Sequence, residues 1–250
     1  MKLGIMQPYF LPYIGYWQLL NAVDTYVVYD DVNFIKGGWI NRNRILVQGR
    51  IQYMNVRMSG SSSFKQINEV RVDASETWRR KLLRTVEMAY RKAPYFSEVF
   101  PLFEHIVCQK ETNLARFLFA SIQEVAAFLH IDTKLLLSSD VSQNRSLHGE
   151  DRVLDICQSL DASEYFNAIG GQALYQTSHF AARGIALYFL QTEAHPYQQF
   201  GDTFVSNLSL LDVMMFNPLE RIKKMLEEYT LIGSTDFAAR KGMAHGTALP

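Results

Sequence analysis

The first thirty residues place an amphipathic segment between two short buried segments, and this order strongly limits the fold. Residues 3–6 are predicted to form a buried strand, and residues 25–30 a second strand rich in β-branched and aromatic side chains. Between them, residues 10–23 carry apolar side chains at near-helical spacing, which predicts a helix. Two buried strands joined by a helix form a right-handed parallel βαβ unit. The chain is therefore expected to begin an α/β sheet.

The same alternation returns in the second half of the chain. Extended segments are predicted at residues 134–138, 164–167 and 185–190, with helices at 149–160, 172–183 and 218–229. Before them, residues 44–56 predict a hairpin that turns at residues 48–50, and residues 75–130 predict three helices. The expected fold is a Rossmann-like parallel sheet with a helical insertion.

Composition supports one integrated α/β domain over residues 1–250. The chain is 48% hydrophobic and contains no Pro/Gly/Ser-rich linker, so it can bury one large core. We expect a helical subregion near 75–130 and a loosely ordered tail near 233–250. The 25 basic and 25 acidic residues balance. This balance argues against nucleic acid as a main partner, because no general positive field is available.

The two cysteines and the hydropathy pattern bear on location. Cys108 and Cys157 lie in apolar stretches with helical spacing, which predicts core thiols in a reducing compartment. The N-terminus has no signal-like apolar region, and no apolar run approaches the ~18 residues that span a bilayer. We therefore expect a cytoplasmic protein without a membrane span.

The loop after the first strand is the first candidate for a ligand site. In open α/β sheets, ligands bind beyond the carboxyl ends of the strands, which is where Gln7, Tyr9 and Tyr13 are expected. Pro8 and Pro12 restrict this loop, which suits recognition by an amide and two phenols. The alternative is that the tyrosines only pack beneath the sheet.

The second strand is followed by a carboxylate and a basic, aromatic segment. Asp31 is a candidate to orient a hydroxyl or an amine, or to accept a proton. Trp39 can stack on a ring, Asn41 can bind a sugar, and Arg42 can grip a phosphate from a loop that has no packing need for a guanidinium. The prediction is one composite cavity lined by five residues, Gln7, Tyr9, Asp31, Trp39 and Arg42. The alternative is an Asp-rich turn beside a solvated basic hairpin.

Two later segments supply further candidates. Asn167, Gly170 and Gly171 follow a predicted strand, and the paired glycines would let backbone N–H groups approach a ligand. Downstream, Tyr197 and Gln199 are candidate binding residues.

His195 is a candidate general base, although a lone loop histidine is more often a solvated bystander. Ser209 and Asp212 have the spacing of a helix-capping pair. No Walker loop, dinucleotide fingerprint, nucleophile elbow or Cys/His metal set occurs, so no metal site is predicted and the cofactor is left open.

Four stretches together carry a resemblance to a known family. They are residues 5–16 (IMQPYFLPYIGY), residues 29–32 with 39–43, residues 167–171 with Leu174 and Tyr175, and residues 197–200 with 208–212. With these stretches the sequence resembles the WbqC-like proteins of bacteria, which occur in gene clusters for O-antigen and related polysaccharides.

The resemblance implies a role in assembling surface polysaccharides, in which acyl or aminoacyl groups are added to nucleotide-linked amino sugars. The expected activity is N-acyl or aminoacyl transfer to a nucleotide-activated amino sugar, with a nucleotide sugar and an acyl thioester donor as partners. Asp31 or His195 would then take the amine proton. The alternative is a noncatalytic nucleotide-sugar-binding or scaffold protein. The sequence leaves the oligomeric state open.

Overall fold

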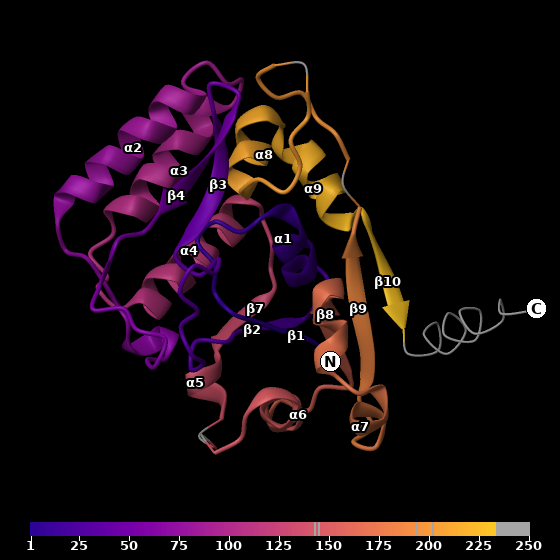
Figure 1. Cartoon of the computed structure of the whole chain (residues 1–250). Helices are drawn as coiled ribbons and strands as arrows, with labels where there is room; N and C mark the ends of the chain where they lie inside the picture. Colours follow the sequence, from indigo (N-terminus) through magenta and orange to yellow (C-terminus); the bar gives the residue numbers. More distant parts are fainter. Residues whose placement is uncertain (143, 145, 194, 202, 234–250) are drawn as a thin grey trace, which may run out of the picture.

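A six-stranded sheet forms the centre of the molecule (Figure 1). The computed structural model describes residues 1–142, 144, 146–193, 195–201 and 203–233. The strands follow the order β10-β9-β8-β1-β2-β7, and every pair is parallel except β9 with β10. Their bounds are β1 Lys2–Met6, β2 Thr25–Val28, β7 Lys134–Leu137, β8 Glu164–Ala168, β9 Ala186–Thr192 and β10 Tyr229–Gly233. The predicted Rossmann-like α/β fold is confirmed.

The order of the strands reverses beside β1. The chain passes from β1 to β2 and then to β7, and it returns to the other side of β1 to form β8 and β9. Loops that leave β1 and β8 therefore diverge at the carboxyl edge, which is the usual place for a ligand in this class of sheet.

Helices cover both faces of the sheet. One face packs against α6 (Gly149–Ser159) and α7 (Thr177–Ala181), and the other packs against α1 (Ile14–Asn21) and α9 (Leu219–Glu227). Successive residues of β2 alternate between the two cores, as the pleat requires, so all four are buried. The remaining short helices are α5 Ser138–Val141 and α8 Leu210–Phe216.

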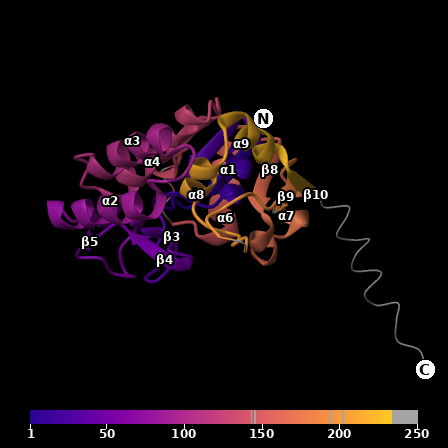
Figure 2. The same ribbon diagram turned by 90° about the horizontal axis from the view of Figure 1, so that it is seen from above.

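The helical insertion lies to one side of this sheet, as Figure 2 shows from above. It contains three helices, α2 Glu76–Tyr90, α3 Phe96–Cys108 and α4 Leu114–Phe128. They pack with the hairpin of β3 (Arg42–Val47) and β4 (Arg50–Asn55). Gln48 and Gly49 form its turn, with φ of 51° and 74°, as the favoured two-residue hairpin turn requires. The smaller elements here are β5 Met58–Ser59, η1 Ile67–Glu69 and β6 Arg71–Val72.

Two helix predictions need correction. The helix expected at residues 10–23 begins only at Ile14, because Leu11 has a φ of 44° and Pro12 follows it. The helix expected at 172–183 is divided into a 3₁₀ segment, η2 (Ile169–Leu174), and α7. The break falls at Tyr175 and Gln176, whose backbone is extended.

The prediction of a core thiol is confirmed for Cys157 but is wrong for Cys108, which is exposed. The buried stripe of α3 contains Val99, Phe103 and Val107. Cys108 follows Val107 directly, and the helical period places its side chain outside this stripe.

Two other sequence expectations concern the C-terminal tail and a membrane span. Most of the predicted loose tail, residues 234–250, lies outside the described residues. Within the described ranges, no helix combines the length and apolarity needed to cross a membrane.

Candidate functional site

The loop between β1 and α1 is fixed by hydrogen bonds from distant segments. Phe10 N donates to Ile40 O at 2.9 Å. Leu11 O accepts from Asn43 Nδ2 at 2.8 Å and from Ser209 Oγ at 2.7 Å. These bonds hold Leu11 at its positive φ, a conformation that costs free energy in a residue other than glycine. The loop is therefore a preorganised support for the side chains that it carries.

Gly15 lets two side chains close around the start of α1. A Cβ at this position would lie 2.3 Å from Thr192 Oγ1 and 2.5 Å from Tyr13 Cε2. Thr192 ends β9, so the missing side chain allows the helix to approach the sheet edge. Burial raises the pKa of Tyr13, and its hydrogen bond to Thr192 opposes that shift. Tyr13 therefore remains a neutral phenol at physiological pH.

A cavity of ≈420 Å³, here called the polar cavity, lies where β1 and β2 end. The N-terminal end of α6 forms its other side. Its lining combines amides, a phenol, an imidazole and an ion pair, contributed by Gln7, Tyr29, Asp31, Val32, Asn33, Ile35, Gln66, Leu147, His148, Gly149 and Arg152.

The ion pair in this wall joins Asp31 to Arg152. Arg152 Nη2 lies 2.7 Å from Asp31 Oδ2, and the two side chains are 3% and 5% exposed. Arg152 also donates to Ser142 O at 2.8 Å, and the other carboxylate oxygen of Asp31 accepts from Ser138 Oγ. The carboxylate is therefore a fixed negative charge with both oxygens already in contact with donors.

Asp30 ties the ends of β2 and β7 together beneath the cavity. It is 2% exposed and accepts from Ser139 N at 3.0 Å, Ser139 Oγ at 2.8 Å and Asn68 Nδ2 at 3.2 Å. These contacts satisfy the buried charge, so Asp30 has a structural role at this edge.

Two donors of the polar cavity are available to a ligand. The Gln7 carboxamide has no hydrogen-bond partner among the residues that the structure describes. Burial raises the pKa of Tyr29, and the charge of Asp31 raises it further, whereas Arg152 opposes the shift. The Tyr29 phenol consequently keeps its proton and can donate a hydrogen bond into the cavity.

A second cavity of ≈310 Å³ is here called the aromatic cavity. The β1–α1 loop and the β2–β3 loop contribute to it, as they do to the polar cavity. Its lining residues are Tyr9, Pro12, Tyr13, Trp39, Asn43, Arg44 and Asn207. Trp39 is 40% exposed, and the Arg44 guanidinium carbon lies 5.2 Å from its ring centroid. Arg44 Nη2 donates to Asn207 O at 3.0 Å, whereas its buried Nε has no partner. The guanidinium gives this cavity a positive charge, which suits an anion.

The composite site predicted from the sequence is divided between these two cavities. Gln7 and Asp31 line the polar cavity, and Tyr9, Tyr13 and Trp39 line the aromatic cavity.

Arg42 lines neither cavity, and the expectation that its guanidinium has no packing role is wrong. Its Nε donates to Gly38 O at 3.0 Å, its Nη2 donates to Gly37 O, and the group lies over the Tyr53 ring. The neighbouring Asn41 donates to Val56 O at 3.0 Å. Both side chains thus hold the hairpin entry, and their ligand contacts remain predictions.

Asn167 faces a buried cluster at the end of β8. Its Nδ2 donates to the hydroxyls of Tyr165, at 2.6 Å, and Tyr175, at 3.2 Å. A Cβ on Gly171 would lie 2.7 Å from Asn167 Oδ1, whereas a Cβ on Gly170 would meet nothing within 4 Å. Gly171 therefore permits close packing against Asn167, and a ligand role for this segment is still a prediction.

Tyr197 and Gln199 converge on a buried carboxylate. Asp212, which is fully buried, accepts from Tyr197 OH at 2.7 Å, Gln199 Nε2 at 2.8 Å and Tyr90 OH at 2.7 Å. Burial raises the pKa of Asp212, and these three hydrogen bonds oppose the shift. Ser209 caps α8 by accepting from Leu211 N, so the predicted cap is confirmed for the serine alone.

His195 lies apart from Asp31. Its Nε2 is 3.8 Å from Glu193 Oε2 and 3.6 Å from Glu228 Oε2, beyond the end of β9. Two strands, β8 and β1, separate β9 from β2 in the sheet. The two candidate proton acceptors therefore do not form one catalytic pair.

Sequence reasoning missed Arg44, Arg152 and Tyr29. Arg152 precedes the buried Ile156 of the same helix by four residues, which placed it on the apolar stripe. A charged residue on such a stripe requires a buried partner, and this was the available signal.

Comparisons with known proteins agree with the resemblance found in the sequence. The model of the WbqC-like protein family matches residues 7–224. The chain is 27% identical over 221 residues to "Uncharacterized protein Rv1507c" of Mycobacterium tuberculosis, covering 86% of this chain and 93% of that protein. No solved structure matches the chain. With a match that spans both cavities and most of the sheet, the chain belongs to the WbqC-like protein family.

Proposed function

We propose that this protein is a cytoplasmic enzyme of surface-polysaccharide (O-antigen) biosynthesis that transfers an acyl or aminoacyl group to the amine of a nucleotide-activated amino sugar. The observation that carries the proposal is the pair of cavities built by the same two loops at the carboxyl edge of the sheet. One is aromatic and cationic, whereas the other is polar and contains a carboxylate. A nucleotide sugar has two halves that complement them, an aromatic, anionic nucleotide and a polar sugar.

The aromatic cavity suits the nucleotide. Trp39 offers a half-exposed ring on which a base can stack, and base stacking on an aromatic side chain contributes ~1–3 kcal/mol. Arg44 lies beside this ring, and its guanidinium lines the cavity, where it can donate to a phosphate oxygen. This assigns to Arg44 the phosphate contact that the sequence suggested for Arg42.

The polar cavity suits the amino sugar. Gln7 and Tyr29 can donate to sugar hydroxyls, and each oxygen of Asp31 retains a lone pair for the amine. In the transfer, the amine nitrogen attacks the thioester carbonyl carbon, the C–S bond breaks, and the leaving thiolate receives the proton that the amine loses. Asp31 orients the amine and relays this proton.

One observation favours the noncatalytic alternative. Asp31 is held by Arg152 and Ser138, and His195 lies at another part of the sheet edge. A chain that only binds a nucleotide sugar needs the same cavities but no proton acceptor. The two functions differ in whether the amine is acylated when a thioester is supplied.

Binding is tested by thermal melting with uridine diphosphate sugars that do or do not carry a free amine. The proposal predicts a rise in Tm that is largest for the amino sugar. Gln7→Ala and Arg44→Ala should each reduce that rise, whereas Lys81→Ala, on the exposed face of α2, should not.

The same mixtures, incubated with acetyl-coenzyme A and followed by mass spectrometry, test transfer. An acetylated sugar supports the enzyme, and binding without product supports the noncatalytic alternative. No change in Tm with any nucleotide sugar would overturn both.

A further inference from the structure

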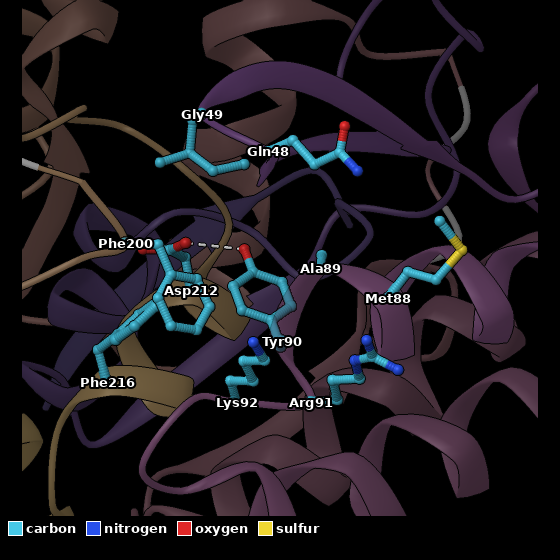
Figure 3. A pocket seen from close by; sticks show the side chains of 11 residues that line it. Gln48, Gly49, Met88, Ala89, Tyr90, Arg91, Lys92, Phe200, Asp212 and Phe216 are labelled. Atoms are coloured by element: carbon cyan, nitrogen blue, oxygen red, sulfur yellow. Dashed lines mark hydrogen bonds between the residues drawn. The ribbon is translucent and has the colours of Figure 1, made fainter.

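A third cavity of ≈290 Å³, here called the thioester pocket, lies outside the proposed sugar site (Figure 3). Three distant parts of the chain form it: the end of β3 with its turn, the C-terminal end of α2, and residues between positions 200 and 216. The lining residues are Leu46, Gln48, Gly49, Met88, Ala89, Tyr90, Arg91, Lys92, Phe200, Asp212 and Phe216.

The sides of this pocket expose large apolar groups to solvent. Phe200 and Phe216 make an edge-to-face contact with centroids 4.8 Å apart, and Figure 3 shows Met88 on the opposite side. Phe200 is 41% exposed and Met88 is 59% exposed. Apolar side chains that face each other across a hollow mark a site for an apolar group.

The carboxylate in the floor of the pocket is already satisfied. Among the described lining residues Asp212 is the only acid, and three hydrogen bonds from Tyr90, Tyr197 and Gln199 satisfy it. Tyr90 donates its proton to that carboxylate. The pocket therefore suits binding, with the chemistry taking place elsewhere.

Two unpaired cations stand beside the apolar walls. Arg91 and Lys92 are exposed, and neither makes an ion pair within the described part of the chain. Figure 3 places both below Tyr90, between the phenylalanines and Met88. A hollow with apolar walls and a cationic rim complements a ligand with a phosphate at one end and an uncharged arm behind it.

We propose that the thioester pocket binds the phosphopantetheine arm of an acyl thioester. Its phosphate lies at Arg91 and Lys92, and its arm lies along Phe200 and Phe216. This inference rests on the proposed function, because the bound thioester is the acyl donor for the amino sugar. The arm is common to coenzyme A esters and to carrier-protein esters, so the pocket recognises the chemistry that they share.

The position of the pocket fits this role. Leu46 lines the thioester pocket and Arg44 lines the aromatic cavity, and both side chains project from the same face of β3. Two residues along a strand span ~7 Å. The donor thus binds beside the cavity assigned to the nucleotide, and its extended arm runs past that cavity toward the amine in the polar cavity.

Calorimetric titration of the full chain tests the proposal with three probes: acetyl-coenzyme A, S-acetyl-4′-phosphopantetheine and pantetheine, which lacks the phosphate. We expect the two phosphorylated probes to bind and pantetheine to bind more weakly. The double variant Arg91→Ala/Lys92→Ala should lose about 10- to 100-fold in affinity for the phosphorylated probes.

The matched control is Arg80→Ala/Lys81→Ala, which removes the same charge from exposed positions of α2 about two turns before Met88. It should leave affinity unchanged. Phe200→Ala should weaken all three probes.

The outcomes separate the inference from the proposed function. If both double variants lose affinity equally, or if no probe binds while a nucleotide sugar does, the thioester pocket is overturned and the sugar site stands. If thioesters bind but nucleotide sugars do not, the proposed function fails and the pocket stands. Similar binding of both phosphorylated probes identifies the arm alone as the ligand, whereas stronger binding of acetyl-coenzyme A identifies the free cofactor ester as the source.

Discussion

Arg152 on α6 forms a buried ion pair with Asp31 at the end of β2, with 2.7 Å between Nη2 and Oδ2. The two residues are 121 positions apart in the sequence. The pair fixes the N-terminal end of α6 against the carboxyl edge of the sheet, and it forms one wall of the polar cavity.

Breaking this pair should destabilise the fold. Arg152→Met leaves a buried carboxylate without its cation, and we expect it to lower the free energy of unfolding by about 3–5 kcal/mol. The double variant Asp31→Leu/Arg152→Met removes both charges and should recover most of that loss. Urea unfolding measures both, and a double variant as unstable as Arg152→Met would contradict the prediction.

Gly15→Ala should destabilise the protein through a steric clash. The new Cβ meets Thr192 Oγ1 and the Tyr13 ring at less than 3.0 Å, and overpacking of this kind costs about 1–3 kcal/mol. Gly170→Ala is the matched control, because its Cβ meets nothing within 4 Å. Thermal melts compare the two, and equal Tm values would show that α1 can shift without cost.

Asp212 should make stability fall as pH rises above about 4. Burial raises the pKa of Asp212 in the folded state, so the folded carboxyl keeps a proton that the unfolded chain loses above the ordinary value of 3.8. Stability falls with rising pH where the folded state binds more protons, and the loss is complete above the folded pKa.

Asp212→Asn removes this titration. Urea unfolding of both proteins at several values from about pH 4 to about pH 7 should show the wild type losing stability relative to the variant. A difference that does not change with pH would contradict the expected shift.

Arg44 and Arg42 should respond differently to substitution. Arg44→Ala removes the guanidinium that lines the aromatic cavity and should weaken nucleotide-sugar binding by about 10- to 150-fold. Arg42→Ala removes hydrogen bonds to Gly37 and Gly38, so it should mainly lower Tm. Calorimetry beside thermal melts measures both effects. An equal loss of affinity in the two variants would return Arg42 to the binding site.

Local patterns in the sequence predicted most of the parallel sheet, because buried strands and amphipathic helices have distinct periods. They missed β10, a short edge strand whose alternation is weak: of Tyr229–Gly233, only Ile232 is buried. The residues 7–13 were correctly placed at a strand end, since topology alone brings them there.

Partners remote in the sequence could not be predicted in the same way. The hydroxyls of Tyr90 and Tyr197 meet on Asp212 from segments 122 and 15 residues away, and no local period records that contact. Arg42 and Arg44 illustrate a similar limit. They are two residues apart on one strand, yet one hydrogen-bonds to its own loop and the other lines a cavity.

The hydrogen bond from Ser209 Oγ to Leu11 O joins residues 198 positions apart. During synthesis, the first loop therefore lacks this hydrogen bond until the ribosome has made more than four-fifths of the chain. Contacts of such long sequence separation form late and slow the folding of a domain. A nascent chain interrupted before residue 209 would have its βαβ unit but an unsupported first loop, so truncated products should lack binding competence even where their secondary structure is intact.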